Sequence, residues 1–177
     1  YPRYFDPLTR RPCPPEVAAD RLAAGQIPHP GLANRLLAKP WLPGVELFHA
    51  DFSGQAFGRH SHDAFAIGAI VQGVGGYQCR GQRYALPAGT LSLMNPEEPH
   101  TGHAESARVV YRMLYVEESR LPALLGRKRL PNGFSTLNPD DDGRVAASLA
   151  QLAGEFERGE RLAYVAIGFF REVAQRL

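Results

Sequence analysis

Three histidines have the residue type and the spacing of a metal site. His60 and His62 are separated by one residue, and two side chains at i and i+2 on a strand point to the same side. His100 follows a turn at Gly89 and a short apolar strand, so an antiparallel barrel can bring it beside the first two. Three imidazoles that converge inside a barrel suit Zn, Ni, Cu or Fe. His103, on the same loop, is a fourth candidate.

A second interpretation of these histidines needs no metal, because polar groups also line ligand pockets and cap strand ends. Other catalytic chemistry has little support. The sequence contains no Gly-x-Ser-x-Gly turn, and residues 73–76 are typical of a hairpin turn rather than a phosphate-binding loop. Cys79 lies in a predicted strand with no histidine placed beside it. A disulfide between Cys13 and Cys79 is possible from their types, but their spacing does not require it.

The elements that must position these histidines are short strands joined by turns. Apolar and β-branched runs alternate with Gly and Pro signals roughly every ten residues, which is typical of a β-sandwich or barrel. One pair of strands is expected to form a hairpin around Gly81. The predicted strands are 45–52, 64–72, 77–80, 83–86, 90–94, 108–116 and 134–137.

The segments on either side of these strands are predicted to be helical. Proline precedes and glycine follows the first of them, and apolar residues spaced by three and four mark the long C-terminal ones. The predicted helices are 16–24, 31–38, a turn over 119–125, a helix from Asn138 or Asp140 to about Phe156, and one over about 160–177. The predicted organisation is a helical or extended segment (1–44), a barrel (45–137) and a helical segment (138–177).

The last predicted helix carries more apolar surface than packing on its own small domain requires. The surplus either buries a partner chain or packs on the barrel. The first alternative predicts a homodimer through residues 160–177. The candidate dimer contacts are Leu162, Val165, Phe169, Phe170 and Val173.

Composition places the chain among ordinary globular proteins. It has 177 residues, 44% of them hydrophobic, and 20 basic against 18 acidic residues give a net charge of +2. That balance differs from the strongly basic surface of a nucleic-acid-binding domain, and residues 127–129 are interpreted as a solvated loop. Neither a membrane-spanning run nor a signal peptide is evident, so we expect a cytoplasmic protein without a membrane partner. The chain starts without Met and stops inside a predicted helix, which suggests a fragment.

The histidine spacing resembles the two sequence motifs of the cupin fold. The first motif is His-x-His followed by Glu and Gly; the first two histidines and Gly73 match it, but Ala66 stands at the Glu position. Gly89 and His100 match the second motif, in which Glu97 occupies a position that normally holds Gly. The resemblance therefore implies three of the four usual metal ligands, with the carboxylate missing.

A longer stretch, residues 45–117, resembles the N-terminal sensor domain of AraC-family transcription regulators. The resemblance rests on residues 60–65, 77–89, 93–102 and 111–115. It implies a mainly β fold, a small cupin-like barrel (jelly roll) with short N-terminal helices, and C-terminal helices that dimerise. It also implies a small-molecule effector. Members of that family bind DNA through a C-terminal helix-turn-helix domain, so DNA is expected as a partner only through a domain outside this chain.

The resemblance also implies an effector pocket inside the barrel. Aromatic and aliphatic walls with a few polar groups are usual for such a pocket, and Arg80 or Arg112 could bind a carboxylate ligand. A register slip of one residue would exchange the inward-facing and outward-facing sets. The expected ligand-binding residues are His60, His62, Phe65, Tyr77, Arg80, Tyr84, His100 and Tyr111, with Ile67, Met94 and Met113 as further inward-facing candidates.

Two other functions are weighed against the sensor. A metal-dependent cupin enzyme, of the oxygenase or isomerase type, would use the three histidines, with Glu97 or Glu98 as the nearest base. The missing carboxylate and the helical segment argue against it. The other alternative is a barrel that serves only in protein interaction and binds no ligand.

Overall fold

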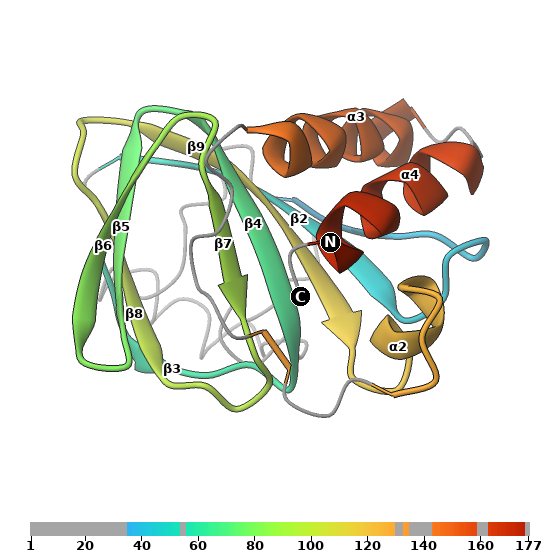
Figure 1. Cartoon of the computed structure of the whole chain (residues 1–177). Helices are drawn as coiled ribbons and strands as arrows, with labels where there is room; N and C mark the ends of the chain where they lie inside the picture. The colour runs from blue at the N-terminus through green and yellow to red at the C-terminus, as the bar shows by residue number, and fades with distance from the viewer. Residues whose placement is uncertain (1–34, 54–55, 130–132, 135–142, 159–162, 176–177) are drawn as a thin grey trace, which may run out of the picture.

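Two antiparallel β-sheets face each other in the structure (Figure 1). The computed structural model describes residues 35–53, 56–129, 133–134, 143–158 and 163–175. One sheet has the strand order β1-β2-β9-β4-β7 and the other β3-β8-β5-β6. The strands are β1 (Arg35–Ala38), β2 (Val45–Phe52), β3 (Ala56–His60), β4 (Ala64–Gln72), β5 (Val74–Cys79), β6 (Gln82–Pro87), β7 (Leu91–Met94), β8 (His100–Ala104) and β9 (Val109–Glu117). The helices are α2 (Leu121–Leu124), α3 (Arg144–Arg158) and α4 (Ala163–Ala174).

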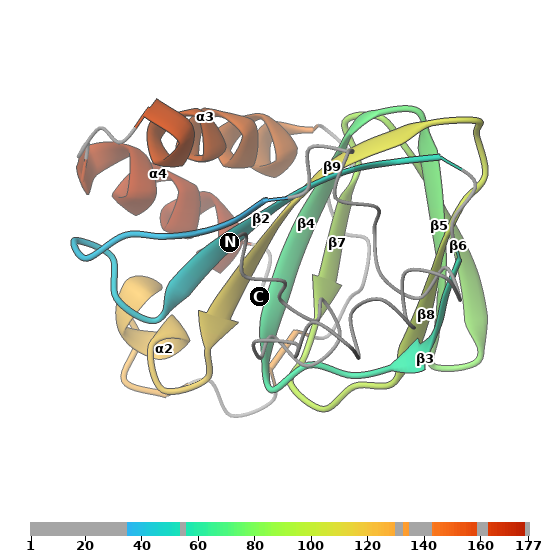
Figure 2. The same cartoon turned by 180° about the vertical axis from the view of Figure 1, so that it is seen from behind.

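The five-stranded sheet separates two hydrophobic cores. The barrel core lies between the two sheets, and the helix-side core lies between the five-stranded sheet and the helices. Alternate residues of β9 serve the two sides: Met113 and Tyr115 belong to the barrel core, whereas Leu114 and Val116 belong to the helix-side core. Figure 2 shows β2 and β9 beside α3 and α4 from behind. The mainly β, cupin-like fold with C-terminal helices is therefore confirmed.

Most of the predicted strands are confirmed. The strands predicted over 45–52 and 64–72 have those bounds, and the strand predicted over 108–116 is shifted by one residue. β5 and β6 form the predicted hairpin, and its two-residue turn is Arg80–Gly81, with φ of 51° and 76°. Two successive positive φ angles are what a type I′ hairpin turn requires, and glycine adopts one of them at no steric cost.

The predicted helix over 31–38 is wrong where the structure describes it. Arg35–Ala38 form β1, which pairs with β2. Leu36 packs against the barrel core and Leu37 against the helix-side core, so neighbouring side chains face opposite sides as in a strand. Pairing with β2 outweighs the weak local helix preference of this short segment. The predicted helix over 16–24 lies outside the described residues.

The C-terminal helices are confirmed, and α3 buries the predicted apolar face. None of the described helices is long and apolar enough to cross a membrane. Phe134 is described and is not part of a strand, whereas the rest of the strand predicted over 134–137 and the two candidate N-caps of α3 lie outside the described residues. The side chains that form the buried face of α3 are Val145, Leu149, Leu152 and Phe156.

The apolar residues of α4 predicted to contact a partner pack within the chain. They are at most 6% exposed and belong to the helix-side core. In this structure these side chains therefore offer no open surface to a second copy, whereas Ile167 is exposed on the part of the helix whose burial is described. Leu162 lies outside the described residues, and dimerisation through residues 160–177 stays a prediction. The buried residues are Val165, Phe169, Phe170 and Val173.

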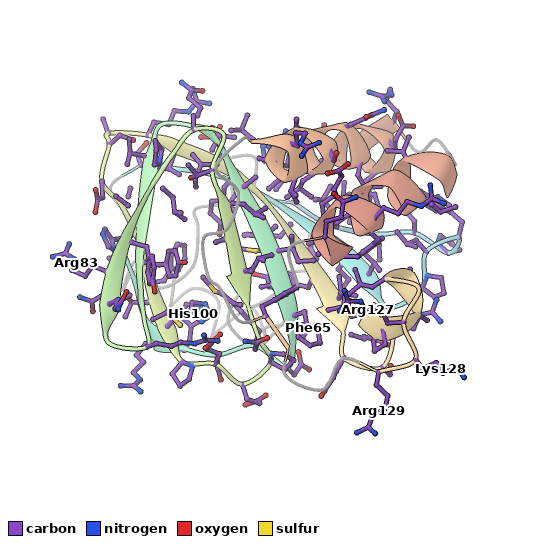
Figure 3. The ribbon with its side chains drawn as sticks, viewed as in Figure 1. Phe65, Arg83, His100, Arg127, Lys128 and Arg129 are labelled. Carbon is purple, nitrogen blue, oxygen red and sulfur yellow. The ribbon has the colours of Figure 1, made fainter. Side chains whose placement is uncertain are left out.

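The basic loop 127–129 is exposed and points away from the barrel (Figure 3). The guanidinium of Arg127 donates a hydrogen bond to the carbonyl oxygen of Ala174 at 3.1 Å, at the end of α4. Orphan carbonyl groups at a helix C-terminus favour a cation there. This contact gives Arg127 a structural role in tying the loop to α4.

Candidate functional site

The three predicted histidines converge at one end of the barrel. His60 is the last residue of β3 and pairs with His100, the first residue of β8. His62 lies in the connection between β3 and β4, so the prediction that both residues of the His-x-His pair lie on a strand is wrong. The connection still brings the third ring into place: the ring centroids are 4.4 to 5.1 Å apart. One ligand nitrogen of each histidine lies within 4.8 Å of the others.

Backbone carbonyl groups orient two of these imidazoles. Nδ1 of His60 lies 2.7 Å from the carbonyl oxygen of Gly58, and Nδ1 of His100 lies 2.9 Å from that of Glu98. A carbonyl oxygen only accepts hydrogen bonds, so each Nδ1 carries the proton and each Nε2 keeps its lone pair. Metal-binding histidines are typically fixed in this way through their second nitrogen. The donor set therefore fits a Zn-, Ni-, Cu- or Fe-type ion.

Burial keeps His100 uncharged at neutral pH. The residue is 6% exposed, and desolvation lowers the pKa of its imidazole from 6.5 to about 4. The hydrogen bond to the Glu98 carbonyl opposes this effect, and the neighbouring His60 adds to it. A neutral imidazole is the form that binds a metal or accepts a hydrogen bond from a ligand.

The loop over 95–98 holds two of the three histidines. The backbone N–H of Glu97 donates to the carbonyl oxygen of His62 at 2.7 Å, and the Glu98 carbonyl holds His100. The Glu98 carboxylate accepts hydrogen bonds from Nε of Arg80 and from the backbone of Asn95. Burial opposes ionisation, but these hydrogen bonds prevail and lower the pKa of Glu98. A charged carboxylate thus fastens the loop to the β5–β6 turn.

Glu97 has a backbone conformation that favours glycine. Its φ is 57°, it stands at the glycine position of the cupin motif, and its side chain is exposed. A side chain in the left-handed region costs about 1–2 kcal/mol. We expect Glu97→Gly to raise the free energy of unfolding by about 1 kcal/mol, because part of the gain is lost to the freer unfolded chain. Urea denaturation measures the change. Glu118→Gly, at an exposed position without positive φ, should give no gain, and a destabilised Glu97→Gly would contradict the prediction.

A cavity of about 90 Å³ lies beside the histidines, between the two sheets. It has room for several water molecules or a small organic molecule. Polar residues, among them the histidines, Ser92 and several tyrosines, interrupt a wall that is otherwise mostly apolar. No Asp, Glu, Lys or Arg lies among the described residues of this wall. Prominent members of the apolar part are Phe57, Ile70, Met94, Val109 and Met113.

The predicted ligand-binding residues fall into two groups. The larger group lines the cavity and consists of His60, His62, Tyr77, His100 and Tyr111, together with Met94 and Met113. Burial raises the pKa of both Tyr77 and Tyr111, so these phenols are neutral at physiological pH.

The smaller group does not line the cavity. Phe65 and Ile67 lie in the helix-side core, where the ring of Phe65 is 5.3 Å from that of Phe134. Figure 3 shows Phe65 toward the helices and His100 between the sheets. Arg80 pairs with Glu98 instead, and Tyr84 stacks on Tyr77 with ring centroids 4.7 Å apart.

Sequence reasoning missed several residues of the wall. Tyr115 lies with its ring 4.9 Å from that of His62, and Ser92 is buried opposite. Two-residue alternation from Met113 and Met94 would have placed both. His103 also lines the cavity, but its Nε2 lies 3.2 Å from a Glu105 carboxylate oxygen, and it is not part of the three-histidine cluster. Neither glutamate proposed as a base, at positions 97 and 98, belongs to the wall.

A polar cluster connects the cavity wall to α3. Arg112 lies on β9 between Tyr111 and Met113, two residues that line the cavity. Its guanidinium lies 3.2 Å from Nε2 of His49 on β2 and 3.4 Å from a carboxylate oxygen of Glu157 on α3. Nδ1 of His49 lies 3.0 Å from the same oxygen. A shift of β9 would therefore change the contacts of Glu157 at the C-terminal end of α3.

We expect Arg112 and Glu157 to be energetically coupled. A double-mutant cycle with Arg112→Gln and Glu157→Gln should give a coupling free energy of about 1 kcal/mol, since the pair is partly buried. Denaturant unfolding of the four proteins measures it. The control cycle combines Arg112→Gln with Glu105→Gln, which the ion pair does not include, and should give a coupling below about 0.3 kcal/mol. Equal coupling in the two cycles would contradict the contact.

Comparison with known proteins places this architecture in a family. The model of the AraC-like ligand binding domain matches residues 42–167. Similar solved structures include a conserved protein of unknown function from Streptococcus pyogenes (21% identity, 49% of this chain and 74% of that one, TM-score 0.43). They also include a cupin superfamily protein from Desulfitobacterium hafniense (14% identity, 60% and 91%, TM-score 0.45). Nothing among the curated proteins matches. Because the family model covers more than two thirds of its length, the chain belongs to the AraC-like ligand-binding domain family.

Proposed function

We propose that this chain is the small-molecule-sensing and dimerisation domain of an AraC-type transcription regulator in the cytoplasm. The cavity beside the three histidines carries the proposal, because it offers a small ligand a mostly apolar site between the two sheets in a domain of this family. The regulator would act on DNA through a helix-turn-helix domain outside these 177 residues. As a homodimer, the sensing domain would control the orientation of the helix-turn-helix domain.

The route from ligand to helices runs through β9. An effector in the cavity touches Tyr111 and Met113, and the opposite face of the same strand carries Arg112, which contacts Glu157 of α3. An effector changes the equilibrium between two arrangements only when it binds one of them better than the other. The side chains of Tyr111, Met113 and Tyr115 on β9 would supply contacts that differ between such arrangements.

Ligand screening with a cavity-filling variant tests the sensing function. Sugars, amino acids, aromatic acids and fatty acids are screened by thermal shift against the wild type, and binders are titrated by calorimetry. Ser92→Leu places extra side-chain volume in the cavity and should weaken each true ligand at least tenfold. Ser53→Leu, at an exposed position, should leave affinity unchanged. Ligands that bind Ser92→Leu as tightly as the wild type, or no binder at all in the screen, would contradict the proposal.

Dimerisation is tested separately by analytical ultracentrifugation. We expect a concentration-dependent dimer. A monomer at every concentration would remove the dimerisation part and leave ligand sensing standing. Sequence-specific DNA binding by this chain alone would show that we assign that function to the wrong part of the regulator.

A further inference from the structure

The charge of the cavity indicates what kind of ligand it can hold. Three imidazoles meet at one point of the wall, and the described wall contains no carboxylate, ammonium or guanidinium group. Arg80, in the β5–β6 turn, is paired with Glu98 and lies outside the wall. An anion entering the metal-free cavity would thus find no fixed positive charge in the described wall to offset the cost of leaving water.

A divalent ion bound to the histidines would bring a positive charge that no side chain of the described wall balances. The three histidines are neutral ligands, with Nδ1 of His60 and of His100 committed to backbone carbonyl groups. An ion held by them keeps its full charge of +2 inside the barrel. Three-ligand sites of this kind leave a coordination position open. Since no side chain of the described wall is an anion, a ligand that carries a carboxylate would supply the compensating charge.

We propose that the three-histidine cluster binds a divalent transition metal and that the effector is a small organic acid whose carboxylate binds to that metal. This inference rests on the proposed sensing function and names the class of ligand. The metal would supply the positive charge that the wall lacks. His60, His62 and His100 would hold it at the edge of the cavity, where all three line the wall.

The rest of the wall fits an apolar body on the acid. Ile70, Met94, Val109 and Met113 surround the space beyond the histidines, and Phe57 adds an aromatic edge. The hydroxyl group of Ser92, which is buried in the wall, offers a hydrogen bond to a second oxygen. The small volume of about 90 Å³ favours a compact acid over a long-chain one.

The first experiment measures metal binding. Tag-free protein is freed of metal with a chelator and titrated with Zn²⁺ by calorimetry, and with Co²⁺, whose visible absorption reports its ligands. His100→Ala should lower the Zn²⁺ affinity at least ~100-fold. His60→Ala, at the less buried edge of the cluster, gives the same test if the first variant fails to fold. His103→Ala is the matched control, because His103 lines the same cavity outside the cluster, and should bind Zn²⁺ like the wild type. Equal affinity in all four proteins would overturn the metal site.

The second experiment measures the class of ligand, with benzoate as the probe and benzyl alcohol as its neutral counterpart. Benzoate should bind Zn²⁺-loaded protein at least tenfold tighter than metal-free protein and change the Co²⁺ spectrum. Benzyl alcohol should show neither effect. Benzoate that leaves the spectrum unchanged, or binds both forms equally, would overturn the inference. The sensing function would survive that outcome if a neutral ligand from the screen binds in a way that Ser92→Leu weakens. It would fail if no ligand binds either form of the protein, or if Ser92→Leu weakens none of the ligands that bind.

Discussion

Truncation of Phe156 to alanine is expected to lower the free energy of unfolding by about 3–5 kcal/mol. The side chain is completely buried on α3, in the helix-side core, with its ring centroid 5.5 Å from that of Trp41. Removing it loses the burial of an aromatic ring and leaves a cavity that the rigid sheet cannot close. Guanidinium denaturation of the wild type and the variant measures the loss.

Two comparisons make this prediction specific. Ile167→Ala, at a 53% exposed position of α4, should change the stability by no more than about 0.5 kcal/mol. The folded Phe156→Ala protein should bind Zn²⁺ like the wild type, because the five-stranded sheet separates the helix-side core from the histidines. A loss below about 1 kcal/mol would mean that the helices are not anchored on the sheet in the way described.

The strands were predictable where the sequence carries both an apolar run and a turn residue that ends it. β2, β4 and β9 are long apolar runs, and Gly73 ends one of them at a point where an added Cβ would lie 2.1 Å from the backbone oxygen of Arg108. Only glycine fits where two segments of the chain approach each other so closely, so a glycine in the sequence marks this turn. β1 lacks such signals. Its four residues are too few to show a hydrophobic alternation, and pairing with β2 stabilises them as a strand.

The candidate site was predictable in part. The spacing of the histidines indicated the cluster, because the motif places all of them near the ends of paired strands. Phe65 was assigned to the wrong face because β4 is buried on both sides. A strand without polar residues on either face gives no sign of which side meets the cavity. Only the pairing of Ala66 with Met94 and Tyr115 settles that choice, and pairing is a property of the fold.

The apolar surface of α4 shows a further limit of sequence reasoning. Phe169 and Phe170 are adjacent and therefore about 100° apart around the helix, which widens the apolar stripe. Both are buried here, as is Val173, and all three belong to the helix-side core. A count of apolar residues indicates how much helix surface must be buried, but it does not show whether a partner chain or the same chain buries it. In this chain α3 and the rest of the helix-side core cover it, so a dimer would need other contacts of the helices.

Protonation of His100 should make the metal-free protein less stable in acid. The pKa of this imidazole is about 4 in the folded chain and about 6.5 in the unfolded one, so between these values the unfolded state binds more protons. The contribution of His100 is complete above pH 6.5 and is lost as the pH falls through 4, and it amounts to about 3 kcal/mol. Because carboxylates titrate near the lower end of this range, the quantity to measure is the difference between the wild type and His100→Gln in urea unfolding from pH 7.5 to 4. That difference should shrink as the pH falls, whereas His103→Gln should follow the wild type. Parallel curves for the wild type and His100→Gln would show that the imidazole is solvated, and with it that the barrel is open at the histidine cluster.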